Sequence, residues 1–301
     1  MEISNPDRVI FPEDDITKGE VCDYYSSVAE LMLPFIEGRA LTVERYPKGI
    51  DSKGFMQKNA PSHFGDELIG RIVLEKEDGG TTAYPVISSV DAIVAFANLG
   101  VITFHVPPVR VASGWHPDWM IWDLDPPEGE LEAVRQAAVA VKTQLASFGI
   151  STALMASGSK GYHLRARIET TLSLSQAATI ARGTAALACQ AYPDLLTTEF
   201  RRSDRGERVF VDWLRNAALS TSVAPWSLRP RRGAPVATPL SWDELSTVAP
   251  DGVQMAGVAK RFGFDPWTEL ETLDLSDTED EVDDALRAAG MVLEPFDRFR
   301  S

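Results

Sequence analysis

Three aspartates lie in or next to apolar segments of the sequence, where an acidic side chain needs a partner. Asp123 and Asp125 follow the apolar run 120–122, and Asp212 lies inside the apolar segment 209–214. Alternate residues of a strand point to the same face, so Asp123 and Asp125 are predicted to project together. Two close carboxylates repel each other, and a divalent cation relieves that repulsion by taking both as oxygen ligands. Three acids from two strands therefore predict a two-metal site of the kind that transfers phosphoryl groups.

A structural interpretation of the same acids stays open at this point. Asp123 and Asp125 precede Pro126 and Pro127, so they could cap the next helix or form a turn with the prolines. Asp212 is embedded in a second apolar strand, which favours the metal interpretation without excluding the structural one.

A second group of polar residues surrounds the small-residue segment that runs from Ser157 to Gly161, SGSKG. Small residues let the backbone approach an anion, and exposed N–H groups together with Lys160 can hold phosphates. The segment is not a Walker A loop, because the pattern G-x-x-x-x-G-K-[ST] is absent. The alternative is a glycine hairpin with a solvated lysine, and His163 and His105 then become ordinary core histidines.

Charge is distributed unevenly along the 301 residues, which carry a formal net charge of −15. Residues 241–301 hold fifteen acidic and five basic side chains, whereas residues 201–232 hold eight arginines and three acids. Local charge decides where a polyanion can bind, so the total does not exclude a nucleic acid. The arginine-rich stretch is either such a binding surface or a solvated loop.

Several protein classes are excluded by simpler features. No run of about 18 apolar residues is present, which argues against a membrane-spanning segment. The first residues lack the basic and apolar regions of a signal peptide. Cys22 and Cys189 are far apart and match neither a disulfide framework nor a zinc knuckle. We therefore expect a cytoplasmic enzyme with reduced thiols and no membrane partner.

The elements that must position these residues follow from hydrophobic periodicity and capping signals. Thr17 and Glu20 form a capping box that predicts a helix start, and helices are also expected at 89–99, 130–148 and 173–191. Strands are expected at 40–46, 101–106, 118–125 and 208–216, with hairpins at 67–87 and 151–168. The order lacks a regular βαβ rhythm, which favours an α+β fold. Residues 1–301 are interpreted as one domain, with a catalytic region at 1–240 and an acidic, largely helical part at 241–301.

In this order and spacing, the segments resemble the polymerase domain of bacterial DNA ligase D, a member of the archaeo-eukaryotic primase superfamily. The resemblance covers nearly the whole chain and rests on NPDRVIFP, ITKGEVCDYY, GFMQK, DGGTTAYPVI, DLDP, SGSKGYH, VFVDWLRN and VAPWSLRPRRGAPVATPLSWDEL. It implies a primase-type fold, with two packed β-sheets flanked by helices around a central cleft. Because the chain ends soon afterwards, we expect a stand-alone actinobacterial primase-polymerase.

The resemblance also implies roles for individual residues. Asp123, Asp125 and Asp212 match the family's metal-binding acids. The residues matching positions that contact the incoming nucleotide are Ser157, Lys160, His163, His105 and Arg229.

On the DNA side, the resemblance implies a pocket for a downstream 5′-phosphate, formed by Asn5, Arg8 and Lys18. Arg8 stands where lysine is often seen, which keeps the charge and changes the geometry. Phe55 matches the first of two aromatic residues that stack on the template, and the second position is Met56, a poorer stacking surface. Lys58 is expected to contact the DNA backbone.

The implied reaction is nucleotidyl transfer from a nucleoside triphosphate, either NTP or dNTP, to a primer 3′-hydroxyl. Two ions of Mn²⁺ or Mg²⁺ are expected as cofactors, with a preference for ribonucleotides. The expected partners are gapped or broken DNA, a separate ATP-dependent DNA ligase and an end-binding protein.

Three rival interpretations also fit parts of the sequence. Apolar residues before D-x-D also describe haloacid-dehalogenase phosphatases, although Pro126 follows where that family needs a small residue. The segment Lys76–Gly79 fits the K-x-D-G adenylation motif of ligases, although a hairpin turn explains it better. The third is a non-catalytic module that binds DNA ends or recruits a ligase, in which the acidic carboxyl-terminal part serves as a docking surface or as a solvated helix face.

Overall fold

The first helix begins where the capping signal predicts. In the computed structural model, which describes residues 2–75 and 79–293, α1 runs from Lys18 to Ile36. The Thr17 side chain accepts from the Glu20 N–H, and the Glu20 carboxylate accepts from the Thr17 N–H, so the capping box is complete. In the described residues, no helix is long and apolar enough to cross a bilayer.

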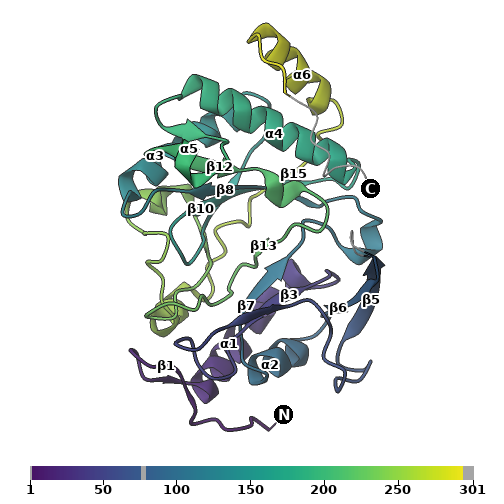
Figure 1. Ribbon diagram of the computed structural model, residues 1–301, viewed down its shortest axis with the longest axis vertical. Helices are drawn as coiled ribbons and strands as arrows, with labels where there is room; N and C mark the ends of the chain where they lie inside the picture. The colour runs from purple at the N-terminus through teal and green to yellow at the C-terminus, as the bar shows by residue number, and fades with distance from the viewer. Residues whose placement is uncertain (1, 76–78, 294–301) are drawn as a thin grey trace.

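The chain builds two lobes, each on its own β-sheet, which lie one above the other in Figure 1. In the lower lobe, α1 and α2 (Val90–Asn98) pack beside a four-stranded sheet and share one apolar core with it. The strand order of that sheet is β13-β7-β3-β4, with bounds Ser222–Val223, Val101–Val106, Thr42–Arg45 and Phe55–Gln57. Two hairpins complete the lobe: β1 (Val9–Phe11) with β2 (Ile16–Thr17), and β5 (Gly70–Glu75) with β6 (Thr81–Val86).

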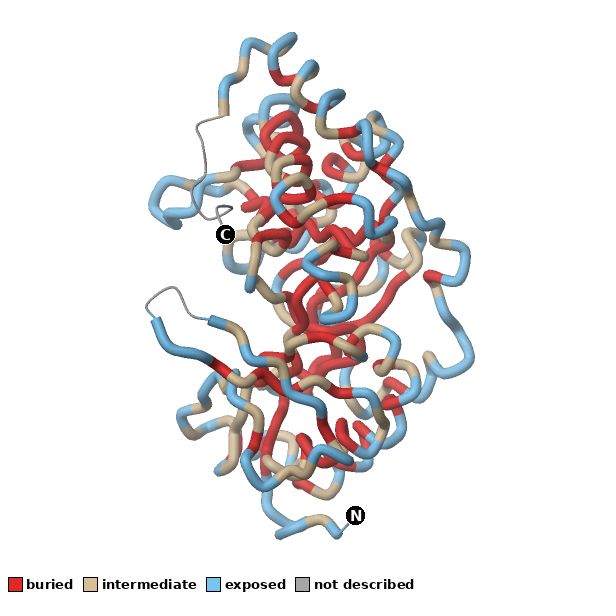
Figure 2. Tube along the Cα trace, turned by 90° about the vertical axis from the view of Figure 1, so that its right-hand side faces the viewer, coloured by how far each residue is buried: buried red, intermediate tan, exposed pale blue. Residues whose placement is uncertain are grey.

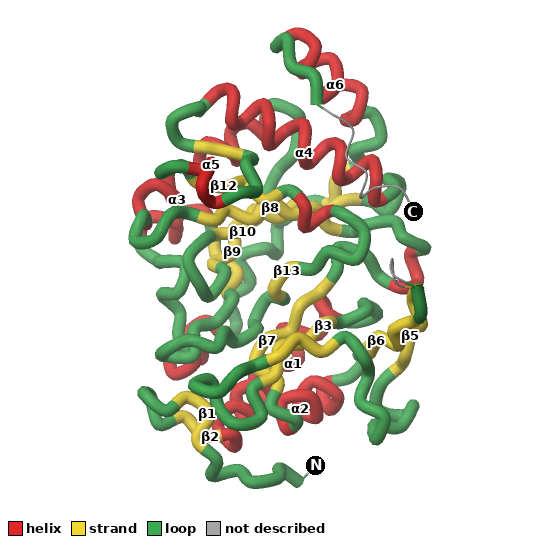
Figure 3. The backbone as a smooth tube through the Cα atoms, in the orientation of Figure 1, coloured by secondary structure: helices red, strands yellow, loops and turns green. Residues whose placement is uncertain are grey.

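The upper lobe holds a seven-stranded sheet in the order β11-β12-β8-β10-β9-β14, and β15 pairs in parallel with β10. The strands are bounded by Leu196–Thr197, Val209–Asp212, Trp119–Asp125, Tyr162–Ile168, Ala153–Ala156, Thr238–Leu240 and Thr272–Leu273. Helices α3 (Leu131–Ala146) and α4 (Leu174–Ala191) pack on one face of this sheet. Figure 3 shows the two sets of strands facing the middle of the molecule, with helices outside them.

Strand β8 is central, and its alternating side chains explain both its burial and its acids. Met120, Trp122 and Leu124 point into the core under α3 and α4. The alternate residues Asp123 and Asp125 face the other lobe, because they line one cavity with His105 of β7. An apolar strand therefore ends in two carboxylates at the space between the lobes.

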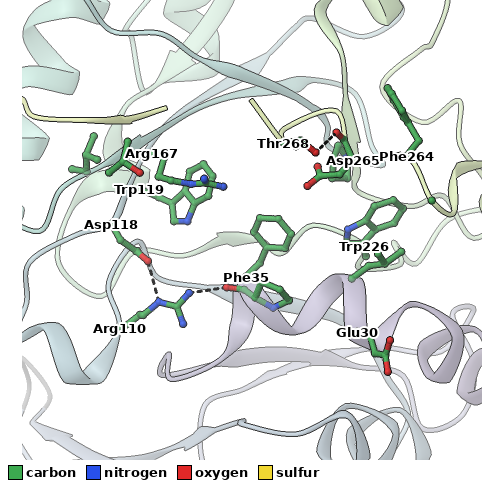
Figure 4. A pocket seen from close by; sticks show the side chains of 16 residues that line it. Glu30, Phe35, Arg110, Asp118, Trp119, Arg167, Trp226, Phe264, Asp265 and Thr268 are labelled. Carbon is green, nitrogen blue, oxygen red and sulfur yellow. Dashed lines mark hydrogen bonds and ion pairs between the residues drawn. The ribbon is translucent and has the colours of Figure 1, made fainter. Parts of the chain in front are cut away.

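The two lobes are joined by packed side chains as well as by the chain itself. Figure 2 shows buried segments in both lobes and across their junction. Arg39 of the lower lobe donates to Asp118, just before β8, at 2.6 Å. Burial lowers the pKa of Arg165 to about 9, and its guanidinium lies 5.0 Å from the ring centre of Trp119. Beside this junction lies a cavity of about 760 Å³ with Phe35, Trp119, Trp226 and Phe264 in its wall (Figure 4).

The carboxyl-terminal part packs onto both lobes: Leu245, Leu275 and Val282 belong to the upper core, whereas Met255 and Val258 belong to the lower one. It contains the short 3-10 helices Trp242–Ser246 and Met255–Arg261, strand β15, and α6 (Thr278–Ala288). Val282 and Leu286 of α6 are buried against α4, and Gly183 of α4 leaves the space for Val282. Only part of this region is helical, because a strand and irregular segments separate the helices.

Most predicted elements are confirmed within a few residues, and so is the α+β class. The segment 208–216 is the main exception, because β12 ends at Asp212 and a 3-10 helix, Leu214–Asn216, follows. The K-x-D-G segment at 76–79 falls largely on residues outside those described.

Candidate functional site

The three acids lie side by side on two paired strands. In the register of β12 and β8, Asp212 is opposite Asp123, and in that of β10 and β8, His163 is opposite Asp123. Paired residues in an antiparallel sheet share a face, and Asp125 lies two residues from Asp123. Asp123 and Asp212 are each 7% exposed, so the acids form a largely buried row at one end of the sheet.

The turn after β12 fixes this row. The chain leaves the sheet after Asp212, whose Oδ1 accepts from the Leu214 N–H at 2.9 Å. Asn216 then takes the place of a strand residue: its Oδ1 accepts from the Ile121 N–H at 2.8 Å, and its Nδ2 donates to the Ile121 carbonyl at 2.7 Å. Because Asn216 holds the 3-10 turn against β8, the residue before it, Arg215, lies over the acids.

Arg215 bridges two of the three carboxylates. Its Nε lies 3.0 Å from Asp123 Oδ2, and one terminal nitrogen lies 3.0 Å from Asp212 Oδ2. His163 Nε2 lies 3.2 Å from the other oxygen of Asp123. In the sequence, Arg215 stands out only as part of the arginine-rich stretch 201–232. The signal that could have identified it is a cation three residues after a buried acid, where a turn can fold it back.

The acids have opposite protonation tendencies. Burial raises the pKa of Asp125 to about 7, with further repulsion from Asp123 and a smaller contribution from Asp212. Burial would also raise the pKa of Asp123, but His163 and Arg215 outweigh it and hold that pKa well below its usual range. Burial raises the pKa of Asp212 as well, against the opposing charge of Arg215. When all three are ionised, these carboxylates carry more negative charge than the single Arg215 guanidinium balances.

These residues fit a divalent cation. Three carboxylates on one face are hard oxygen ligands of the kind that Mg²⁺ and Mn²⁺ take. A cation already lies between two of them, in the form of the Arg215 guanidinium. Among the residues described, no three acidic, histidine or cysteine side chains are already drawn together as a metal cage. At this site the guanidinium occupies the space between two of the candidate ligands.

The SGSKG segment forms a tight loop between β9 and β10, beside the acids. The Ser157 N–H donates to the Gly161 carbonyl at 3.1 Å, and Gly158 has a φ of +67°. A Cβ on Gly161 would lie 1.7 Å from the Leu124 carbonyl, so only glycine allows the loop to approach β8 this closely. The Lys160 ammonium lies 3.7 Å from the exposed Glu128 carboxylate.

A polar cavity of about 150 Å³ brings the predicted nucleotide-contacting residues together with two of the acids. His105 on β7 reaches this cavity from the lower lobe, and Arg229 reaches it from the segment that follows β13. Burial, reinforced by Arg229, lowers the pKa of His105 to about 3, so its imidazole is neutral. Within the described part of the chain, Arg229 Nε and His163 Nδ1 are buried without a hydrogen-bond partner. The complete lining is His105, Asp123, Asp125, Ser157, Ser159, Lys160, His163, Arg215, Thr221, Ser222, Val223 and Arg229.

The residues expected to bind a 5′-phosphate lie together in the lower lobe, at the hairpin before α1. The Arg8 N–H donates to the Asn5 carbonyl at 3.2 Å, and the Lys18 N–H donates to the Arg8 carbonyl at 2.7 Å. The Lys18 ammonium is buried and donates to the Ser4 hydroxyl at 2.7 Å, and burial lowers its pKa. Their side chains contribute two cationic groups to one small region.

The residues expected to face the template lie on and after the edge strand β4. Phe55 and Met56 are 46% and 51% exposed, and Lys58 is also exposed. The Arg45 guanidinium lies 5.4 Å from the centre of the Phe55 ring, which leaves the rest of that ring on the surface. An exposed aromatic side chain on an edge strand can stack on a base.

Comparison with known proteins gives one consistent result. The model of the family described as LigD, primase-polymerase domain, matches residues 17–267. The multifunctional non-homologous end joining protein LigD of Mycolicibacterium smegmatis is 35% identical over 249 residues, covering 82% of this chain and 32% of that protein. The bifunctional non-homologous end joining protein LigD of Bacillus subtilis is 31% identical over 250 residues, covering 82% and 40%. The chain spans about a third of the length of these relatives.

Among solved structures, the chain is similar to the polymerase domain from Mycobacterium tuberculosis ligase D in complex with DNA. The TM-score is 0.77 and the sequence identity is 33%, covering 98% of this chain and 96% of that one. Both lobes therefore have counterparts in that structure.

Proposed function

The chain belongs to the LigD primase-polymerase domain family, and we propose on this basis that it is a template-directed nucleotidyltransferase acting at DNA gaps or breaks. The resemblance seen in the sequence is thereby confirmed, and so is the primase-type fold. The observation that carries the proposal is the row of Asp123, Asp125 and Asp212 beside the SGSKG loop. The phosphatase interpretation loses its basis, because these acids belong to a different fold.

The residues around the row of acids have separate roles in nucleotidyl transfer. The triphosphate binds against Lys160 and Arg229, whose positive charges compensate the phosphates, and the SGSKG loop contributes backbone N–H groups. His163 holds one oxygen of Asp123, which fixes the direction of that carboxylate. His105 stays neutral and contributes a hydrogen-bonding nitrogen instead of a charge. Together these groups hold the α-phosphate where a primer 3′-hydroxyl attacks in line.

Asp123, Asp125 and Asp212 would hold two divalent cations, either Mn²⁺ or Mg²⁺. Such ions, when bound, activate the attacking hydroxyl and neutralise the charge that develops on the pyrophosphate. The carboxylates supply the negative charge that concentrates them at one end of β8. A preference for ribonucleotides and for Mn²⁺ is part of the proposal and comes from the family resemblance.

DNA is the proposed macromolecular partner. It is supported by the related ligase D polymerase domain, which is described as being in complex with DNA. Asn5, Arg8 and Lys18 would receive the 5′-phosphate of the downstream strand, while Phe55 and Lys58 would contact the template. A separate ATP-dependent ligase and an end-binding protein are proposed as further partners, since the relatives are end-joining proteins.

Primer extension on gapped DNA tests this function. The substrate is prepared with and without a 5′-phosphate on the downstream strand, and is offered NTPs or dNTPs with Mg²⁺ or Mn²⁺. We expect templated addition that the 5′-phosphate strengthens and that requires a divalent cation. Binding of gapped DNA without any extension under all these conditions would favour the non-catalytic end-binding module instead.

A further inference from the structure

All four oxygens of Asp123 and Asp212 already have a partner. Arg215 pairs with Oδ2 of both residues at 3.0 Å. His163 Nε2 lies 3.2 Å from Oδ1 of Asp123, and the Leu214 N–H donates to Oδ1 of Asp212 at 2.9 Å. Of the three acids, Asp125 is the one without a hydrogen bond or ion pair to another residue that the structure describes. Each carboxylate oxygen keeps a second lone pair for a metal ion, but the positive charge of Arg215 lies against the same two acids and opposes a second cation there.

The guanidinium is well held where it lies. Its third nitrogen donates to the Thr221 carbonyl at 3.3 Å, so all three nitrogens are engaged. Its planar fork matches two carboxylates, which a flexible ammonium cannot reproduce. The side chain is nevertheless 34% exposed and lines the same cavity as Lys160 and Arg229. It can therefore leave the acids without becoming an isolated buried charge.

We propose that Arg215 is an intramolecular counter-cation that competes with the divalent cations for Asp123 and Asp212. This inference rests on the proposed two-metal function and deepens it. Without metal, the guanidinium neutralises the repulsion among the acids and holds them in register. A divalent cation then binds only as Arg215 is released from Asp123 and Asp212. Because the lost ion pairs cost free energy, metal binding is weaker when no nucleotide is present.

The nucleotide completes the exchange. A triphosphate in the cavity offers Arg215 a new anionic partner as the carboxylates are given up. Each binding event then favours the other by the same factor, because coupling between two sites is reciprocal. A site built in this way binds metal weakly until its substrate arrives.

Binding of Mn²⁺ itself tests the proposal, measured from the electron paramagnetic resonance signal of the free ion. Wild-type protein is compared with Arg215→Gln, which removes the charge and the bridge. We expect Arg215→Gln to bind Mn²⁺ about tenfold more tightly than wild type in the absence of nucleotide. A non-hydrolysable nucleoside triphosphate analogue should strengthen Mn²⁺ binding in wild type and much less in the variant. Titration without protein corrects for Mn²⁺ held by the analogue.

Arg232→Gln is the matched control, since it removes an arginine of the same stretch that is 78% exposed and pairs only weakly with Glu13 at 3.5 Å. It should bind Mn²⁺ as wild type does. If Arg215→Gln does not fold, Arg215→Met replaces it, because methionine also removes both the charge and the bridge and keeps an unbranched side chain. Mn²⁺ affinity equal to or weaker than wild type in the folded variant overturns the inference alone. Absence of Mn²⁺ binding by every protein, with and without analogue, overturns the proposed function as well.

Discussion

Asp123 and Asp125 are two residues apart on one strand, yet their surroundings separate their chemistry. The Asp123 carboxylate pairs with His163 and Arg215, so its pKa falls. Asp125 is largely buried beside the other acids, so its pKa rises to about 7. The i, i+2 spacing was enough to predict that they share a face. The sequence could not predict which acid would be paired, because Arg215 reaches Asp123 only through the turn that Asn216 stabilises.

His105 gives a pH-dependent prediction. Its pKa is about 3 in the folded state and about 6.5 when unfolded. As the pH falls below 6.5, the unfolded chain binds a proton that the folded protein refuses, so stability decreases. We expect His105→Gln to lose less stability than wild type between pH 7 and pH 5, by at most about 2 kcal/mol. The free energy of unfolding at the two pH values measures this.

The exposed His63 provides the control for that comparison. His63→Gln should follow the wild-type pH dependence. A His105→Gln protein that loses as much stability on acidification as wild type would show that the imidazole protonates freely in the folded state.

Among the elements, the helix starts were the most predictable feature, because capping is local. Thr17, Ser89 and Ser173 were each expected near a helix start, and each accepts from a backbone N–H of the first turn. The 3-10 turn after Asp212 was predicted as strand, since its apolar pattern continues that of β12. It leaves the sheet because the Asn216 amide replaces the backbone partner of Ile121. Such a replacement depends on the neighbouring strand, which the local sequence does not contain.

The loop between β9 and β10 gives a prediction at this scale. In Gly161→Ala, the added methyl would collide with the Leu124 carbonyl, between the two acids of β8. We expect a loss of about 2 kcal/mol in stability, together with weaker nucleotide binding, because the loop must move away from β8. Denaturant unfolding and a nucleotide titration measure the two effects.

Gly257→Ala is the matched control, as a Cβ there meets no atom within 4 Å. It should leave both stability and nucleotide affinity close to wild type. If Gly161→Ala behaves in the same way, the close approach of the loop to β8 is not required for the site.

At the scale of the whole molecule, the site exists because two lobes face each other. The row of acids and the SGSKG loop come from the upper lobe, and His105 comes from the lower one. Periodicity predicted most of the strands but not their order, β11-β12-β8-β10-β9-β14, which places distant segments side by side. Strand order depends on long-range pairing, and here only the family resemblance anticipated the two-sheet arrangement.

The junction of the lobes gives a prediction of its own. Arg39 is 1% exposed and pairs with Asp118 at 2.6 Å, across the two lobes. Asp118→Asn leaves this guanidinium buried without a full counter-charge, so we expect a loss of about 3 kcal/mol in the free energy of unfolding. Asp66→Asn breaks an ion pair with Arg71 in which the aspartate is 94% exposed, and should cost less than about 1 kcal/mol. Equal effects of the two substitutions would mean that the Arg39 pair does not stabilise the junction.

The central claim is that the row of acids is a metal centre for nucleotidyl transfer. Primer extension with Mn²⁺ by Asp123→Ala, beside measurement of its affinity for gapped DNA, tests it most directly. Asp194→Ala, an exposed acid on the same lobe, is the control. We predict that Asp123→Ala loses extension while its DNA affinity stays close to wild type, and that Asp194→Ala retains both. Undiminished Mn²⁺-dependent extension by Asp123→Ala would contradict the account.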